Sequence, residues 1–94
     1  MAKIRRDGHW VSFWCPGCEM EHEIAVAGPT APKAVWTLTG GPFKPTAKPS
    51  VLVRNPKRTR CCHLWMTEGR LQYLSDCTHA LAGQTVDMQD MKEE

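Results

Sequence analysis

A chain of 94 residues is long enough for one domain, and 41% hydrophobic with 23% charged residues is the composition of a folded protein. The net charge of +2 does not by itself indicate a nucleic-acid partner, and five cysteines, an odd number, argue against a closed disulfide framework. The N-terminus lacks the apolar core of a signal peptide, and no stretch approaches the roughly 20 apolar residues of a membrane span. We therefore expect an intracellular protein with reduced thiols that are available to a metal.

The first predicted element is a strand over residues 10–14, which are aromatic and β-branched. It leads into Cys15-Pro16-Gly17-Cys18, whose two thiols can lie on one side of a tight turn, as two corners of a tetrahedral zinc site require. Residues 19–26 are expected to return as a partner strand in their second half, so the turn becomes the tip of a hairpin. A redox dithiol fits less well because no crossover helix follows the motif.

Six of the seven prolines lie in residues 29–56 and predict a loop-rich middle without a long helix or a regular central strand. Residues 35–38 and 50–53 are short strand candidates within it. The same region contains six cations and no acidic residue between them: Lys44, Lys48, Arg54, Lys57, Arg58 and Arg60. Such a strip can follow the phosphates of a nucleic acid, and a solvated basic loop is an equal alternative.

The next predicted hairpin pairs residues 62–67 with residues 70–75 around a two-residue turn, Glu68-Gly69. Strand alternation places Cys62 on one face and makes it a neighbour of Cys77 at the open end of the hairpin. His63 points to the opposite face, beside Asp76. Residues 78–83 are expected to form one helical turn or a loop, and residues 1–8 and 88–94 are expected to be disordered tails of a single domain spanning 1–94.

The metal site predicted from these elements holds one Zn²⁺ on Cys15, Cys18 and two further ligands. Hairpin geometry favours Cys62 and Cys77, while His79 and His63 stay open as alternatives, the latter with Asp76 as an acceptor for its ring. His22 is interpreted as a polar strand residue and Cys61 as a spare thiol. Four protein ligands would leave no position for a catalytic water, so we expect a structural metal and no enzyme activity.

Several motifs resemble a family of small proteins of unknown function from tailed bacteriophages and prophages. They are residues 13–18, Cys62-His63 and residues 76–86, which read Asp-Cys-Thr-His-Ala-Leu-Ala-Gly-Gln-Thr-Val. The resemblance covers residues 10–87 and implies a phage origin and a location in the cytoplasm of a bacterial host. Members of that family often carry the label ammonia monooxygenase, which we reject because the chain lacks a membrane span and its cysteines suit zinc better than copper or iron.

These observations predict a mostly β, zinc-ribbon-like domain of two or more hairpins stapled by a metal, with a Pro-rich central loop. The favoured function is an interaction module that binds a host or phage macromolecule, most simply a protein, without a membrane. The first alternative is a nucleic-acid binder that uses the basic stretch 44–60. A weaker alternative is a zinc enzyme with an open metal site.

Overall fold

The computed structural model describes residues 2–26, 36–54 and 60–91, which form strands and turns without a helix. The strands are β1 (Arg5–Asp7), β2 (Trp10–Cys15), β3 (Met20–Ala25), β4 (Thr37–Thr39), β5 (Thr46–Arg54), β6 (Cys61–Thr67), β7 (Arg70–Tyr73) and β8 (Thr85–Asp87). They build a three-stranded sheet in the order β1-β2-β3 and a five-stranded sheet in the order β4-β5-β6-β7-β8. All of these strand pairs are antiparallel. The prediction of a mostly β fold is therefore confirmed.

The hairpin β2–β3 carries the thiol turn at its tip, as the sequence predicts. Its register runs from Trp10 opposite Ala25 to Cys15 opposite Met20. Side chains alternate along β2, so that Val11, Phe13 and Cys15 are fully buried while those between them are half-buried. Cys15 therefore points into the core from the last residue of the strand.

The hairpin β6–β7 also has its predicted register, with Leu64 opposite Tyr73 and Thr67 opposite Arg70. The turn residues Glu68 and Gly69 have φ values of 48° and 78°. Positive φ at both central positions is what a type I′ turn requires, and this turn matches the twist of the two strands. Strand β7 ends at Tyr73, two residues earlier than predicted.

Strand β5 is longer and more central than its prolines suggest. It spans nine residues and lies between β4 and β6, although Pro49 is part of it. Its pairing with β6 shifts between Ala47, opposite Met66, and Val51, opposite Leu64. Between these two pairs β5 covers four residue steps and β6 only two, as in a β-bulge. The proline and its neighbours therefore lie outside the regular hydrogen-bond ladder. Pro29, Pro32 and Pro56 lie outside the described residues.

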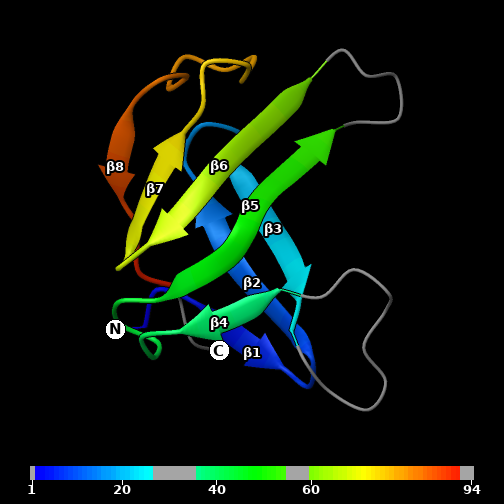
Figure 1. The fold of residues 1–94 in the computed structure, drawn as a ribbon, viewed down its shortest axis with the longest axis vertical. Helices are drawn as coiled ribbons and strands as arrows, with labels where there is room; N and C mark the ends of the chain where they lie inside the picture. The colour runs from blue at the N-terminus through cyan, green and yellow to red at the C-terminus, as the bar shows by residue number, and fades with distance from the viewer. Residues whose placement is uncertain (1, 27–35, 55–59, 92–94) are drawn as a thin grey trace.

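The two sheets lie face to face with one core between them (Figure 1). Strand β6 contributes Cys62, Leu64 and Met66 to this core, and its alternate residues face outward. Trp65 is accordingly 38% exposed although tryptophan is usually a core residue. The fold thus has an inner face, shared by both sheets, and an outer face of the five-stranded sheet that meets solvent.

The prediction of disordered tails has to be corrected for the residues described near both ends. Residues 5–7 form β1, and Met88 and Met91 are 2% and 5% exposed. The Met91 amide donates to the Ala2 carbonyl, and the Lys3 ammonium lies 2.7 Å from an oxygen of Asp90. Isolated methionines in a polar run give no periodic signal, so this packing is not visible in the sequence.

Deletion of residues 88–94 is therefore expected to lower the free energy of unfolding by about 2–5 kcal/mol, because it removes two buried methionine side chains. Deletion of residues 92–94 alone is the matched control and keeps both methionines. Urea unfolding followed by tryptophan fluorescence measures the difference. Equal midpoints for the two truncations would contradict the packing of Met88 and Met91.

Candidate active site and metal centre

Four potential metal ligands from both sheets meet on the inner face. The tip of the β2–β3 hairpin supplies Cys15 and Cys18, β3 supplies His22, and β6 supplies Cys62. One ligand atom from each of these residues lies within 4.8 Å of the other three. The Cys18 amide also donates to the Cys15 sulfur at 3.4 Å, which orients this sulfur as the chain turns.

Two observations indicate that this group of side chains is suited to bind a metal ion. His22 is 4% exposed, and its Nε2 atom is buried without a hydrogen-bond partner among the described residues, which is costly unless a ligand fills the place. The Cys15 and Cys62 sulfurs lie 3.7 Å apart, and both thiols are free. Tetrahedral corners with metal–sulfur bonds of about 2.3 Å would lie about 3.8 Å apart. Three thiols and one imidazole are the number and kind of donors that a tetrahedral zinc site takes.

The electrostatics of the thiols favour a cation at this place. A hydrogen bond with Cys62 lowers the pKa of the Cys15 thiol to about 3, and the same contact raises the pKa of Cys62. Burial raises the pKa of Cys18 to about 11, and the charge on Cys15 adds to this effect. Among these thiols Cys15 is the one whose surroundings most favour negative charge, and a cation would favour it on the others as well.

Two polar side chains surround the thiols. The Tyr73 hydroxyl lies 3.1 Å from the Cys15 sulfur, and His79 Nε2 lies 3.4 Å from the Cys62 sulfur. The rings of Tyr73 and His79 meet edge to face at 4.5 Å. Because thiolates accept hydrogen bonds, both groups can support sulfur ligands from outside the first coordination shell.

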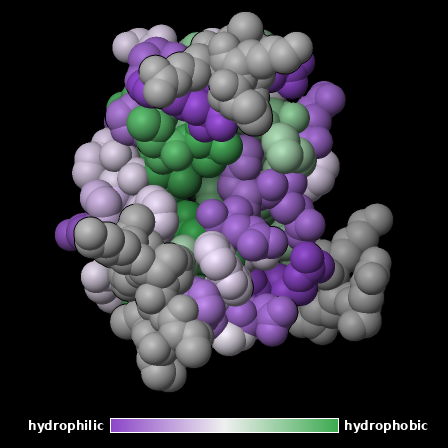
Figure 2. All heavy atoms as spheres, turned by 90° about the vertical axis from the view of Figure 1, so that its right-hand side faces the viewer, coloured by the Kyte–Doolittle hydropathy of each residue, from purple (hydrophilic) through white to green (hydrophobic). Residues whose placement is uncertain are grey.

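An apolar pocket adjoins this group on the side of the molecule that Figure 2 shows. Strand β3 approaches the ends of β5 and β6 there, and the pocket is lined by Cys18, Met20, His22, Val53, Arg54, Arg60, Cys61 and Cys62. Apolar surface is visible in the upper half of this view, bordered by polar residues (Figure 2). The pocket gives an ion a path to the thiols.

The structure unites Cys15, Cys18 and Cys62, three of the predicted ligands, and adds His22, which sequence reasoning missed. A usable signal was its spacing, four residues after Cys18, together with its place on the inward side of β3. Cys77 and His79 lie beside Cys62, within 4.8 Å of it, as a second and smaller group. His63 belongs to neither group, because strand alternation carries its side chain to the outer face. Its candidacy as a metal ligand is therefore withdrawn.

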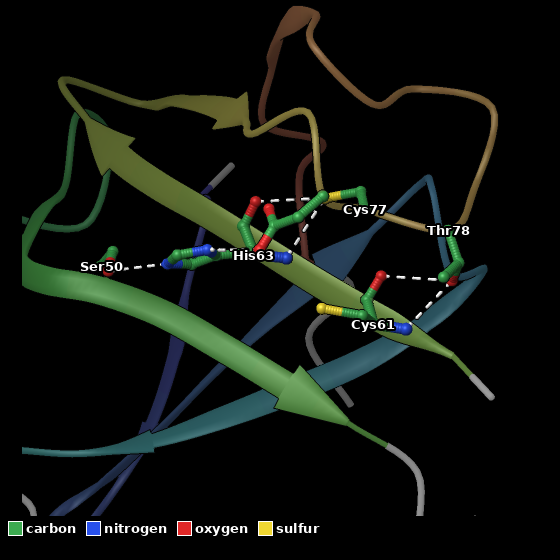
Figure 3. A network of polar contacts seen from close by, with 6 residues as sticks. Ser50, Cys61, His63, Cys77 and Thr78 are labelled. Carbon is green, nitrogen blue, oxygen red and sulfur yellow. Dashed lines mark hydrogen bonds and ion pairs between the residues drawn. The ribbon is translucent and has the colours of Figure 1, made fainter. Parts of the chain in front are cut away.

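On that outer face His63 lies between a serine and a carboxylate. Its Nε2 atom is 3.0 Å from the Ser50 hydroxyl, and its Nδ1 atom is 3.1 Å from Asp76 Oδ2. Figure 3 shows the Ser50 hydroxyl and the His63 ring directed toward each other from neighbouring strands. The hydroxyl thus contacts the imidazole, and the imidazole contacts the carboxylate. This is the arrangement that activates a serine nucleophile.

Three local features position this triad. Ser50 lies two residues before Leu52, the residue directly opposite His63, so alternation directs its side chain to the same face as His63. The Trp36 indole donates to the Ser50 carbonyl at 3.3 Å, which fixes the serine backbone. Asp76 follows β7 in a turn and remains 54% exposed. Nucleophile and base therefore stand on paired strands, while the carboxylate comes from a loop.

The pairing of His63 with Asp76 was predicted from the sequence, but as part of a metal site. Ser50 was not found, because it lacks the Gly-x-Ser-x-Gly turn that marks many serine hydrolases. Each member of the triad is separated from the next by 13 residues. This spacing has no meaning until the strand order β5-β6-β7 is known.

The basic residues do not gather into one strip among the residues described. Lys44 precedes β5 and lines a polar groove with Glu68 and Arg70, whereas Arg54 ends β5 and lines the apolar pocket with Arg60. Lys48 is exposed on β5, between these two ends. Lys57 and Arg58 lie outside the described residues. The nucleic-acid and protein partners stay predictions.

None of the elements in the described residues is a helix able to cross a membrane. No curated protein matches the chain. No solved structure matches it either.

A family model does match, over residues 1–74, and its description is bacterial ubiquitination-like system serine protease (BubE). The match contains Ser50 and His63 and ends two residues before Asp76. It says nothing about the resemblance to phage proteins, which stays a prediction. The expectation of no enzyme activity is wrong, because a family named for a serine protease matches most of the chain. By this match, the chain belongs to the BubE family.

Proposed function

We propose that the protein is a serine protease that uses Ser50 as nucleophile, His63 as general base and Asp76 as the residue that orients the base. The observation that carries the proposal is the pair of contacts on the two nitrogens of His63, 3.0 Å to Ser50 and 3.1 Å to Asp76. The matching family is described as a serine protease of a bacterial ubiquitination-like system, and on that basis we propose a protein of such a system as the substrate.

The geometry leads to a mechanism in two stages. The Nδ1–H of His63 donates to Asp76, which leaves Nε2 unprotonated and facing the serine hydroxyl. His63 takes the Ser50 proton as Oγ attacks the carbonyl carbon of the scissile bond, and it then gives this proton to the leaving amine. The C–N bond breaks and an acyl-serine ester remains. Water, deprotonated by the same imidazole, cleaves the ester and restores the hydroxyl.

The inner site has a different role in this proposal. We propose that it binds one Zn²⁺ through Cys15, Cys18, Cys62 and His22, with the buried unpartnered Nε2 atom of His22 as the supporting observation. Four protein ligands leave no open position on the ion, so its contribution is to the fold. The hydrolytic chemistry then belongs to the outer face.

A fluorophosphonate probe tests the protease proposal, because it reacts with activated serines and leaves ordinary hydroxyls unmodified. We expect intact-mass analysis to show one added probe group on the native protein, and peptide mapping to locate it on Ser50. Ser50→Ala should abolish labelling, and His63→Ala should slow it by about 10³-fold or more. Ser12→Ala, on β2 in the other sheet and so away from the triad, is the matched control.

Labelling that persists in Ser50→Ala, or a native protein that does not react, would refute the assignment of the nucleophile. Cleavage of a proteome-derived peptide library by the native protein, compared with Ser50→Ala, then establishes whether peptide bonds are hydrolysed and which side chains flank them.

A further inference from the structure

Strand β6 extends beyond its partner β7. The β6–β7 pairing stops at Leu64 and Tyr73, but β6 begins three residues earlier, at Cys61. The backbone groups of Cys61 and His63 that face β7 therefore have no strand to pair with, although backbone groups at the edge of a sheet need hydrogen-bond partners.

The segment 74–78, which we name the clamp, supplies these partners from both its backbone and its side chains. The Leu74 amide donates to the His63 carbonyl at 2.9 Å, and the Thr78 amide donates to the Cys61 carbonyl at 2.9 Å. The His63 amide donates to the Cys77 sulfur at 3.2 Å, and the Cys61 amide donates to the Thr78 hydroxyl at 3.0 Å. Figure 3 shows the Cys77 and Thr78 side chains lying along the strand at His63 and Cys61.

The Cys77 thiol contacts both backbone groups of the general base. Besides accepting from the His63 amide, its sulfur lies 3.1 Å from the His63 carbonyl, to which the S–H group donates. The sulfur thus has one partner on the amide and one on the carbonyl of the same residue, and both contacts hold Cys77 against the backbone of the base.

Asp76 depends on the clamp for its position. Its side chain is 54% exposed, so packing does little to hold the carboxylate 3.1 Å from His63 Nδ1. Leu74, two residues before it, and Cys77, directly after it, restrain its backbone instead, since both bind the main chain of His63. The position of the acid is therefore fixed relative to the residue that carries the base.

We infer that Cys77, assisted by Thr78, is a positioning residue that holds the carboxylate of Asp76 against His63. The inference rests on the proposed protease function and identifies a further residue that its reaction needs. Cys77 touches neither substrate nor reacting atoms, and it acts through the backbone of the base. A displacement of about 1 Å in a catalytic group can reduce the rate by about 10²-fold, which sets the size of the expected effect.

The test compares Cys77→Ala, which removes both hydrogen bonds, with Cys77→Ser, which keeps a donor and an acceptor. Hydrolysis of a chromogenic ester should show kcat lowered about 10- to 100-fold in Cys77→Ala with KM nearly unchanged, and largely restored in Cys77→Ser. In an Asp76→Ala background, Cys77→Ala should cause little further loss, because the two residues act in one chain of contacts.

A second readout does not need turnover. The His63 Nδ1 proton, hydrogen-bonded to Asp76, should give a low-field ¹H resonance in native protein and in Cys77→Ser. The resonance should be lost in Cys77→Ala and in Asp76→Asn. Metal content should be the same in all four proteins. If native protein shows no Ser50-dependent hydrolysis, the protease proposal fails, and this resonance still decides the positioning role.

Three outcomes would overturn the inference. The first is a kcat and a resonance in Cys77→Ala that equal those of native protein, and the second is additive losses of kcat in the Asp76→Ala background. The third is loss of metal in both Cys77 variants, which would make Cys77 a ligand.

Should Cys77→Ala not fold, variants of the exposed Thr78 test the same inference. Thr78→Val should lower kcat by a few-fold, Thr78→Ser should restore it, and an unchanged kcat in Thr78→Val would overturn the clamp.

Discussion

Ser50→Ala is expected to lower the kcat of peptide-bond hydrolysis by about 10⁴- to 10⁶-fold and to leave the fold intact. The hydroxyl is the atom that forms the acyl ester, and its removal leaves only binding and electrostatic contributions to the rate. The side chain contacts His63 on the outer face of the sheet and fills no part of the core, so stability should change little.

The other two members of the triad extend this prediction. His63→Ala should cost about as much as Ser50→Ala, and the double variant no more than either, because the residues act as one unit. Asp76→Asn should lower kcat by about 10⁴-fold, since an amide favours the wrong tautomer of the imidazole. Initial rates with a cleavable peptide measure these effects, and circular dichroism controls for folding. Additive losses would contradict a shared mechanism.

Removal of the metal is the change with the largest expected effect on stability. Structural zinc contributes about 10–16 kcal/mol of apparent binding free energy in small domains, which equals or exceeds the whole stability of about 5–15 kcal/mol for a domain of this kind. Cys15, Cys62 and His22 join the two sheets across one core, so the loss of the ion removes their common connection. Chelation or Cys15→Ser should therefore unfold most of the chain.

Elemental analysis of protein purified without a metal-affinity step should find about one zinc per chain, and thermal melting with and without chelator measures the stabilisation. His22→Ala should lose metal as well, because it removes the imidazole ligand. Cys61→Ser is the matched control, since Cys61 belongs to neither ligand group among the residues described. Native protein without zinc, or a Cys15→Ser variant that melts like the native chain, would contradict the metal centre.

Local patterns were sufficient to predict both hairpins that carry the metal ligands. The register of β6 and β7 follows from the two-residue turn and from alternation, and it places Cys62 inward and His63 outward without further information. The thiol turn at the tip of β2–β3 was predictable for the same reason. Both elements are formed by residues that lie close together in the chain.

The remainder depended on contacts between distant segments. Ser50 reaches His63 only because β5 pairs with β6, and proline content argued against a central strand there. His22 becomes a buried ligand only when the second sheet covers β3. The burial of Met88 likewise requires β7 and its turn, whose Gly69 carbonyl accepts the Met88 amide hydrogen. The contacts of Ser50 and Met88 have no periodic or motif signal within their own segments, and His22 has only its spacing from Cys18.

The adjacency of Cys62 and His63 in β6 makes the strand intolerant of slippage. A shift of one residue against β5 would turn the imidazole toward the core and the thiol toward solvent, so that both sites would fail together. Cys62 meets Cys15 and Cys18 from the inner face of β6, and His63 meets Ser50 from its outer face. The ligand group and the triad therefore depend on the same pairing of β6.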